Sequence, residues 1–257
     1  MNTKEFKKIV WDYFKINRRA FPWRETINPY FILVSEVMLQ QTQVNRVISK
    51  YTEFISRFPT VDNLAKADKT EVLKVWQGMG YNRRAMYLYE SAKIIINKHK
   101  SVVPNSVEDL DDLPGIGYAT ASSICAFAFN TPTVFIETNI RSVFIHFFFE
   151  NKTDIADKEI ITLVEKTLDK KNPRQWYFAL MDYGTYLKKT ERNPNRKSKH
   201  YARQSKFEGS NRQLRGQILK LKLVNPKITS SKIAQVLNIS LEKIKDIVIR
   251  LSNEELI

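Results

Sequence analysis

The sequence predicts an all-α protein. Only 7 of its 257 residues are glycine, and apolar residues recur mostly three or four positions apart, with few strand-like alternations. Hydrophobic residues make up 43% and aromatic residues 12% of the chain, which is typical of a globular protein with a sizeable core. The length suits one large domain or two modest ones.

The charge balance favours an acidic partner. Forty-two lysines and arginines stand against 27 acidic residues, which gives a formal net charge of +15. Nucleic acid fits this excess better than a membrane does, because no apolar run approaches about 20 residues and no amino-terminal signal pattern is present. We therefore expect a cytoplasmic protein, associated with the nucleoid if its source is bacterial or archaeal.

Two predicted helices fill the amino-terminal region. Apolar spacing predicts the first over residues 3–14, and a turn with three arginines follows at residues 18–24. The second is predicted over residues 28–44 and carries Glu36 among apolar side chains. Such surroundings raise the pKa of a carboxyl, which suits a proton donor near neutral pH. The pattern alone is equally compatible with a glutamate that reaches solvent or pairs with an arginine.

Short helices are expected next, with buried faces around residues 61–64 and 72–76. Gly78, Met79 and Gly80 then make a turn, and an amphipathic helix with a basic end is predicted over residues 86–100.

A glycine-rich turn follows in the sequence Leu-Pro-Gly-Ile-Gly-Tyr-Ala-Thr, residues 113–120. Gly115 and Gly117 allow backbone geometry and a close approach that side chains would block, and the next helix begins near Thr120. A tight turn that leads into a helix presents unpaired N–H groups to an anion. In so basic a chain we expect a nucleic-acid phosphate, although a G-x-G turn can also merely link two helices.

The turn, together with residues 136–141, resembles the helix-hairpin-helix of DNA glycosylases in the endonuclease III superfamily. Residues 35–43 (Ser-Glu-Val-Met-Leu-Gln-Gln-Thr-Gln), preceded by residues 21–24 and 29–30, resemble the signature of the adenine DNA glycosylase (MutY) family. The likeness covers roughly residues 3–190. It implies a two-lobed helical HhH-GPD fold, with Glu36 as the general acid that protonates adenine and Gln41 in a segment inserted into the duplex.

Three positions depart from that family pattern or extend it. The 78–83 turn is expected to face DNA, but Asn82 stands where the family carries a tyrosine beside the opposing base, which leaves the preference for 8-oxoguanine open. Ala119 stands where endonuclease III relatives carry a lysine that forms a Schiff base, so no lysine-dependent lyase step is expected. Tyr118 could line the base pocket or face solvent.

Glu137 occupies the position of the superfamily's catalytic aspartate. A carboxylate there stabilises the positive charge that develops on deoxyribose as the base leaves. Because glutamate is one methylene longer, the residue is either still the catalytic carboxylate or a mark of altered or lost activity. For Asn139 and Arg141 the likeness implies helix capping and phosphate contact.

No cofactor and no metal site are expected. Relatives usually hold an iron–sulfur cluster with four cysteines, whereas this chain has a single cysteine, Cys125, in an apolar run that predicts a core position, and Lys188 falls where the first ligand would be. The basic segment 188–207 replaces the cluster loop. We interpret it as phosphate-binding, although charge runs are commonly only solvated.

The predicted domains are a glycosylase domain over residues 1–190, a basic linker over 191–211 and a helix-turn-helix-like unit over 212–257. Three helices are expected in the last unit, which could equally be a packing appendage. The predicted DNA-binding residues are Gln41, Gly78, Tyr81, Asn82, Arg83, Gly115, Gly117, Tyr118, Ala119, Thr120, Asn139, Arg141, Lys197, Lys199 and Arg203.

The leading functional hypothesis is a monomeric, monofunctional DNA glycosylase of base excision repair. It would flip a mispaired base out of double-stranded DNA, most simply adenine opposite guanine or 8-oxoguanine, and hydrolyse its N-glycosyl bond with Glu36 and Glu137. Two alternatives stay open: removal of thymine or uracil opposite guanine, and non-catalytic binding of damaged DNA.

Overall fold

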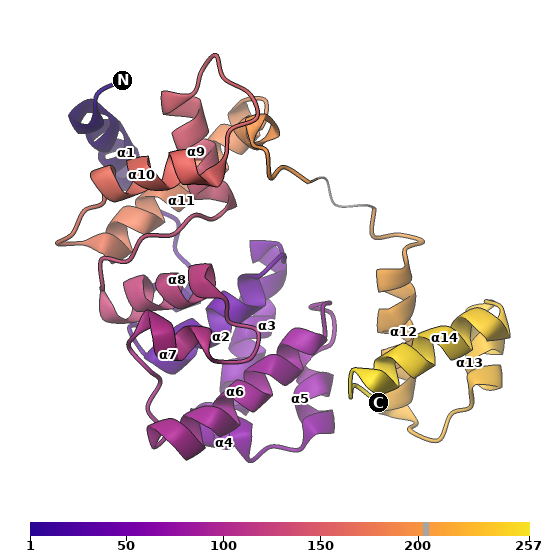
Figure 1. Ribbon diagram of the computed structural model, residues 1–257. Coiled ribbons are helices and arrows are strands. Elements are labelled where there is room, and N and C mark those ends of the chain that lie inside the picture. Colours follow the sequence, from indigo (N-terminus) through magenta and orange to yellow (C-terminus); the bar gives the residue numbers. More distant parts are fainter. Residues whose placement is uncertain (203–205) are drawn as a thin grey trace. The chain divides into compact units, whose positions relative to one another are not determined.

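Helices form the regular structure of residues 1–202 and 206–257, the part of the chain that the computed structural model describes (Figure 1). Within these residues the only β-type pairing is an isolated parallel bridge between Ile155 and Ser198. The all-α prediction is confirmed. None of the described helices is long and apolar enough to cross a membrane.

The helices follow one another with short connections. In chain order they are α1 (Thr3–Asn17), the 3-10 helix η1 (Pro22–Arg24), α2 (Pro29–Leu39), α3 (Val44–Arg57), α4 (Val61–Ala65), α5 (Lys69–Trp76), α6 (Arg83–His99), α7 (Val107–Asp111), α8 (Tyr118–Phe129), α9 (Thr138–Phe148), α10 (Asp157–Thr167), α11 (Pro173–Thr190), the 3-10 helix η2 (Pro194–Lys197), α12 (Asn211–Val224), α13 (Ser230–Leu237) and α14 (Leu241–Asn253).

The chain divides into two compact units that interleave in sequence. The first unit comprises Met1–Glu36, Asn105–Asp112 and Ile116–Arg203, and the second comprises Val37–Pro104, Leu113–Gly115 and Gln204–Ile257. Residues 1–190, predicted as one domain of two helical lobes, contribute to both units, and the last three helices belong with residues 37–104.

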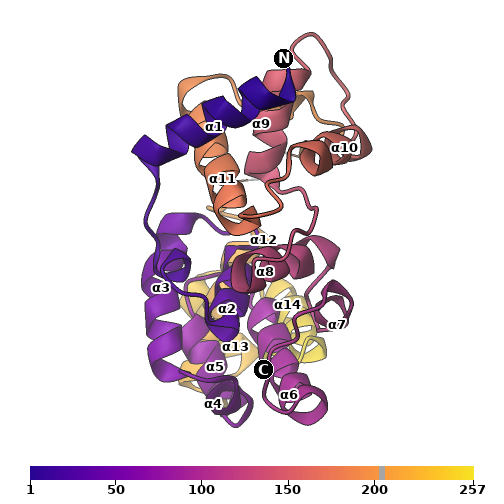
Figure 2. The ribbon, with the colours of Figure 1, turned by 90° about the vertical axis from the view of Figure 1, so that its left-hand side faces the viewer.

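An aromatic cluster fills the core of the first unit. Phe6 of α1 is fully buried, and its ring centroid lies 5.2 Å from that of Phe144 on α9 and 5.9 Å from that of Trp176 on α11. Figure 2 shows α1 crossing α11 and α9, which explains why a helix at the chain start meets helices far along the chain. Burying large aromatic rings in this way supplies much of the apolar stabilisation.

A buried carboxylate fastens the arginine-rich turn to α11. Asp182 is 2% exposed, and its two oxygens accept hydrogen bonds from Arg19 Nε at 2.6 Å and from Arg24 Nη1 and Nη2 at 2.9 and 3.0 Å. The backbone N–H of Arg19 donates to the same group at 3.0 Å. The guanidinium of Arg24 also lies over the Phe178 ring, 4.4 Å from its centroid. A charge buried this deeply is tolerated because every partner is in place.

In the second unit, a buried arginine ends α2. The second helix was predicted to continue to residue 44, but it stops at Leu39, and α3 begins at Val44. The guanidinium of Arg84 donates to the carbonyl oxygens of Val37 and Met38 at 2.8 and 3.0 Å, which the helix end leaves without intrahelical partners. The prediction missed this because residues 40–43 contain neither glycine nor proline to signal a helix end, whereas the side chain that stabilises the break lies on α6.

The predicted linker 191–211 is not uniform. Its η2 helix packs on α9, where Asn195 Nδ2 donates to Thr138 O at 2.9 Å and to Ser142 Oγ at 2.6 Å. The three predicted helices of the tail are present as α12, α13 and α14, with Asn238 in the left-handed conformation (φ 52°) between the last two.

We predict that Asp182→Asn lowers the free energy of unfolding by about 3 kcal/mol, because it leaves the Arg24 guanidinium buried without a counter-charge. Urea unfolding measures the change. The control is Asp12→Asn, since Asp12 pairs with Lys8 and Lys15 on the exposed side of α1 and should leave stability unchanged within error. Equal effects of the two substitutions would contradict the role assigned to Asp182.

Candidate active site

Glu36 lies partly buried on α2, in the first unit. Its Oε2 lies 2.5 Å from the hydroxyl of Ser123 on α8. Removal of the carboxyl from water raises its pKa to about 7; the charge of Glu137 adds to this rise, whereas the Ser123 hydrogen bond and the charge of Arg24 oppose it. A carboxyl with this pKa can carry a proton near neutral pH and give it to a bound base, as predicted for a general acid.

The hydroxyl of Ser123 lies close to two acceptors. It donates to Glu36 Oε2 at 2.5 Å, and its oxygen lies 2.8 Å from the carbonyl oxygen of Thr120. A hydroxyl that donates to a carboxyl favours the ionised form, so Ser123 limits the rise in the Glu36 pKa that burial causes. Sequence reasoning missed Ser123, because it stands in a run of small and apolar residues.

Glu137 forms the amino-terminal cap of α9. Its Oε1 accepts hydrogen bonds from the backbone N–H groups of Asn139 and Ile140 at 2.7 and 2.8 Å, and its Oε2 accepts one from Asn139 Nδ2 at 3.1 Å. The longer glutamate stem therefore still reaches the first turn of the helix, so the carboxylate is held in one orientation. The capping oxygen belongs to Glu137, and Asn139 supports it as a donor.

The first turn of α9 is in close contact with α11. A Cβ on Gly184 would lie only 2.3 Å from the carbonyl oxygen of Asn139, so only glycine allows the two helices to approach this closely. Arg141, for which a phosphate contact was predicted, donates to Asp157 through Nε at 2.8 Å and Nη2 at 2.7 Å and lowers the pKa of that carboxyl. In this structure its guanidinium therefore serves the α9–α10 contact.

The residues present do not fit the iron–sulfur cluster that relatives usually hold. The chain has one cysteine, which is buried on α8 with its Sγ 3.6 Å from Asn105 O, as the core prediction for Cys125 requires. Lys188 is partly buried, and loss of hydration lowers its pKa, although the charge of Glu137 opposes this shift. Among the described residues no group of three or more His, Cys, Asp or Glu side chains could hold a metal ion.

The two glycines of the 113–120 turn differ in their surroundings. Gly115 has φ +73°, and a Cβ there would lie 2.5 Å from the Tyr87 ring, so the fold itself requires glycine. Gly117 has φ −99°, and a Cβ added there would meet no other atom within 4 Å. It precedes α8, whose first turn has no side-chain cap and whose Tyr118 and Ala119 are exposed, with Thr120 half-buried behind them. Open space over uncapped N–H groups suits a phosphate.

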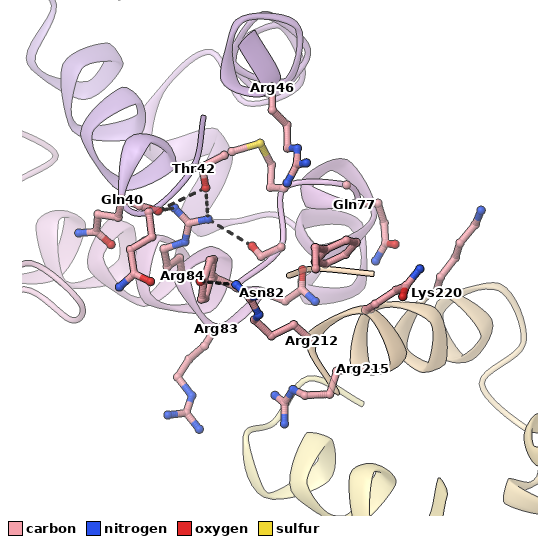
Figure 3. A pocket seen from close by; sticks show the side chains of 18 of the residues that line it. Gln40, Thr42, Arg46, Gln77, Asn82, Arg83, Arg84, Arg212, Arg215 and Lys220 are labelled. Atoms are coloured by element: carbon pink, nitrogen blue, oxygen red, sulfur yellow. Dashed lines mark hydrogen bonds between the residues drawn. The ribbon is translucent and has the colours of Figure 1, made fainter. Parts of the chain in front are cut away.

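In the second unit, five predicted DNA-binding residues line one pocket of about 1040 Å³ (Figure 3): Gln41, Gly78, Tyr81, Asn82 and Arg83. Gln41, Gly78 and Tyr81 all have positive φ values, of 53°, 89° and 47°. Arg84 joins their segments, since its Nη2 donates to Thr42 Oγ1 at 2.9 Å and to Gly80 O at 3.3 Å. Sequence reasoning missed this arginine and also the α12 side chains that line the pocket.

The structure describes two of the three DNA-binding residues predicted in the basic segment. Lys197 donates to the carbonyl oxygen of Glu150 at 2.6 Å, and Lys199 is exposed on the first unit. Arg203 lies outside the described residues.

The pKa of Glu36 makes stability depend on pH. Since the folded protein holds this proton up to about pH 7 and the unfolded chain releases it near 4.5, the wild type loses stability as pH rises through that window. Glu36→Gln removes the effect. We predict that its free energy of unfolding, relative to wild type, increases between these pH values by on the order of 1–3 kcal/mol and is constant above them. A difference that does not vary with pH in urea unfolding would be inconsistent with this assignment.

The Ser123→Ala variant tests this hydrogen bond. Because Ser123 donates to the carboxyl and lowers its pKa, we predict that the substitution raises the pKa of Glu36 and moves the upper end of the pH window above pH 7 in urea unfolding. Movement below pH 7 would show that Ser123 instead stabilises the neutral carboxyl as an acceptor.

Known proteins are similar to this chain in sequence. The chain is 38% identical over 192 residues to the adenine DNA glycosylase of Buchnera aphidicola subsp. Baizongia pistaciae, an alignment that covers 73% of this chain and 54% of the relative. It is 29% identical to the thymine/uracil-DNA glycosylase of Methanothermobacter thermautotrophicus, over 72% of this chain and 85% of the relative. The chain thus spans about half the length of the curated adenine DNA glycosylases it matches.

The fold has a solved counterpart. The structure of a thermostable thymine-DNA glycosylase matches with a TM-score of 0.68 at 27% identity, over 75% of this chain and 90% of that one. The model of the HhH-GPD superfamily of base excision DNA repair proteins matches residues 34–170, more than half of the sequence, and the chain therefore belongs to that superfamily.

Proposed function

We propose that this chain is a monofunctional DNA glycosylase that removes adenine opposite guanine or 8-oxoguanine. The observation that carries the proposal is the partly buried Glu36 carboxyl, whose pKa of about 7 suits a proton donor. Neutral adenine is a poor leaving group, so its removal gains most from an acid. The sequence similarity to adenine DNA glycosylases supports the same substrate.

The proposed reaction uses two carboxyl groups in different ionisation states. Glu36 gives its proton to a ring nitrogen of the flipped adenine, so the electron pair of the bond between C1′ and the base leaves with a neutral purine. The carboxylate of Glu137, held by the α9 N–H groups, stabilises the cation that forms on the sugar. Water then adds to C1′ and loses a proton, which leaves an abasic site.

Binding to double-stranded DNA, as a monomer, is part of the proposal. The open space at Gly117 and the uncapped start of α8 suit one phosphate, and the net charge of +15 favours a polyanion.

A second candidate substrate is thymine or uracil opposite guanine. It is favoured by Asn82 in place of the family's tyrosine and by the similarity to a thymine/uracil-DNA glycosylase. Pyrimidine removal depends less on a protonated carboxyl, so its rate should vary less with pH around 7 than the rate of adenine removal.

We predict that the wild type releases adenine from A·G and A·8-oxoguanine duplexes, faster than thymine or uracil from T·G and U·G, when enzyme is in excess. The rate should fall up to about tenfold per pH unit above pH 7, because Glu36 loses its proton. Glu36→Gln should lower the rate at least about 100-fold and leave DNA binding unchanged. Glu165→Gln, a change on the exposed surface of α10, is the matched control. A fully active Glu36→Gln enzyme would falsify the proposed acid, and binding without release by wild type would favour a non-catalytic binder.

We predict that strands break only after alkali treatment, because Ala119 replaces the lysine of lyase relatives. Labelled duplexes resolved with and without alkali test this. Cleavage without alkali that disappears in Lys188→Gln would instead identify Lys188, which has a lowered pKa and lies within electrostatic range of Glu137, as a lyase nucleophile.

A further inference from the structure

One side of the pocket in the second unit is lined by residues that are not among the predicted DNA-binding residues. Helix α12 lines it opposite the 77–84 turn and the 40–43 segment (Figure 3). Six basic residues face the pocket and one acid, Glu254, which pairs with Arg83 at 3.2 Å and Arg215 at 2.5 Å. The basic residues are Arg46, Arg83, Arg84, Arg212, Arg215 and Lys220. The pocket therefore keeps a positive charge after its internal ion pairs are counted.

The other lining groups indicate which anion fits. Carboxamides come from both walls, among them Gln41 and Gln77 on one side and Gln217 on α12. Tyr81 and Phe207 add rings that are 38% and 53% exposed. Amides that can bind base edges, rings on which a base can stack and cations for the backbone are together the groups with which proteins hold an unpaired nucleotide. A site for phosphate alone would need only the cations.

Within the tail, charge favours α12 over the helix-turn-helix. Helix α12 contains four basic residues and no acid, whereas α14, the helix that a helix-turn-helix would place in the major groove, contains three basic and two acidic residues. Two polar contacts also connect the tail with the rest of the second unit. Arg212 Nη1 donates to Tyr81 Oη in the turn at 3.2 Å, and Lys69 on α5 pairs with Glu255 at 2.8 Å. The tail thus presents α12 to the turn, with its cations at the pocket.

We propose that α12 and the 77–84 turn form a pocket for the nucleotide left unpaired in the opposite strand when the target base is flipped out. The assignment rests on the proposed function, because flipping one base removes the pairing partner of another. Arginine and lysine, which α12 supplies as Arg212 and Lys220, are the side chains that bind O6 and N7 on the edge of guanine. The preferred occupant is therefore a guanine-type base, and α12 is a specificity element.

The backbone of the 40–43 segment and of the 77–84 turn fits this role. Gln41 and Tyr81 are held in left-handed conformations that cost free energy in residues other than glycine. The Arg84 guanidinium stabilises both segments, through Thr42 and Gly80. The two side chains at the pocket are thus oriented before any ligand binds.

Binding to duplexes that need no excision tests the pocket. The full-length chain is titrated with one duplex that holds a tetrahydrofuran abasic analogue opposite guanine, and with another that holds the analogue opposite a second abasic analogue. We expect wild type to prefer the guanine duplex by about tenfold. The double variant Arg212→Gln/Lys220→Gln should lose that preference, to less than about twofold. The matched control, Lys243→Gln/Lys245→Gln, removes the same charge from exposed positions of α14 and should keep it.

Each result decides between the pocket and a general charge effect. Equal loss of affinity for both duplexes in both double variants would overturn the proposal, as would an unchanged guanine preference in the α12 variant. Because Arg212 also contacts Tyr81, the single variant Lys220→Gln, at an exposed position, repeats the test without that contact. Absence of base release together with an α12-dependent guanine preference would refute the glycosylase function and support the pocket. Base release together with a guanine preference that the α12 variant retains would support the glycosylase function and refute the pocket.

Discussion

The buried carboxylate of Asp182 is the interaction on which the first unit depends. It joins a turn near the amino terminus to α11 through side chains 163 and 158 positions away in sequence. The same contact fixes Arg24, whose charge acts on the Glu36 carboxyl and opposes the effect of burial on its pKa. The structural anchor and the acid are therefore electrostatically linked. Burial raises the pKa of Glu36 to about 7, although the Ser123 hydrogen bond and the charge of Arg24 oppose this rise, so the carboxyl titrates near neutrality.

In the second unit, a buried charged side chain likewise stabilises the structure, here at the end of a helix. Arg84 is 7% exposed, and it uses its donors on the carbonyl oxygens that α2 leaves unpaired. Because the helix is terminated from outside, the residues after it can adopt conformations that local sequence preferences disfavour, including the positive φ of Gln41. In the second unit Arg84 thus contacts the residues on either side of Gln41, and in the first unit the charge of Arg24 acts on Glu36.

Much of the fold could be predicted from sequence, because helix formation depends on local spacing. Glu36, Glu137 and the glycine turn belong to motifs of contiguous residues, so the sequence could predict a role for each. Ser123 was not, because its partner is 87 positions away and its own neighbourhood is apolar. The two units could not be delimited either, since their segments alternate along the chain. Likewise, the α12 side chains gain their significance only from the turn opposite them, which lies more than 100 residues earlier in the sequence.

The two glycines of the 113–120 turn illustrate how conformational and ligand constraints can be separated. At Gly115 a positive φ and the Tyr87 ring exclude other residues, so a screen for folded protein would retain glycine there. At Gly117 the backbone is ordinary and the surrounding space is open, so the same screen would accept alanine. Only selection for activity on DNA would then preserve the second glycine. Two glycines of one motif are therefore under different selective pressures, and a comparison of the two screens would distinguish these pressures without a bound complex.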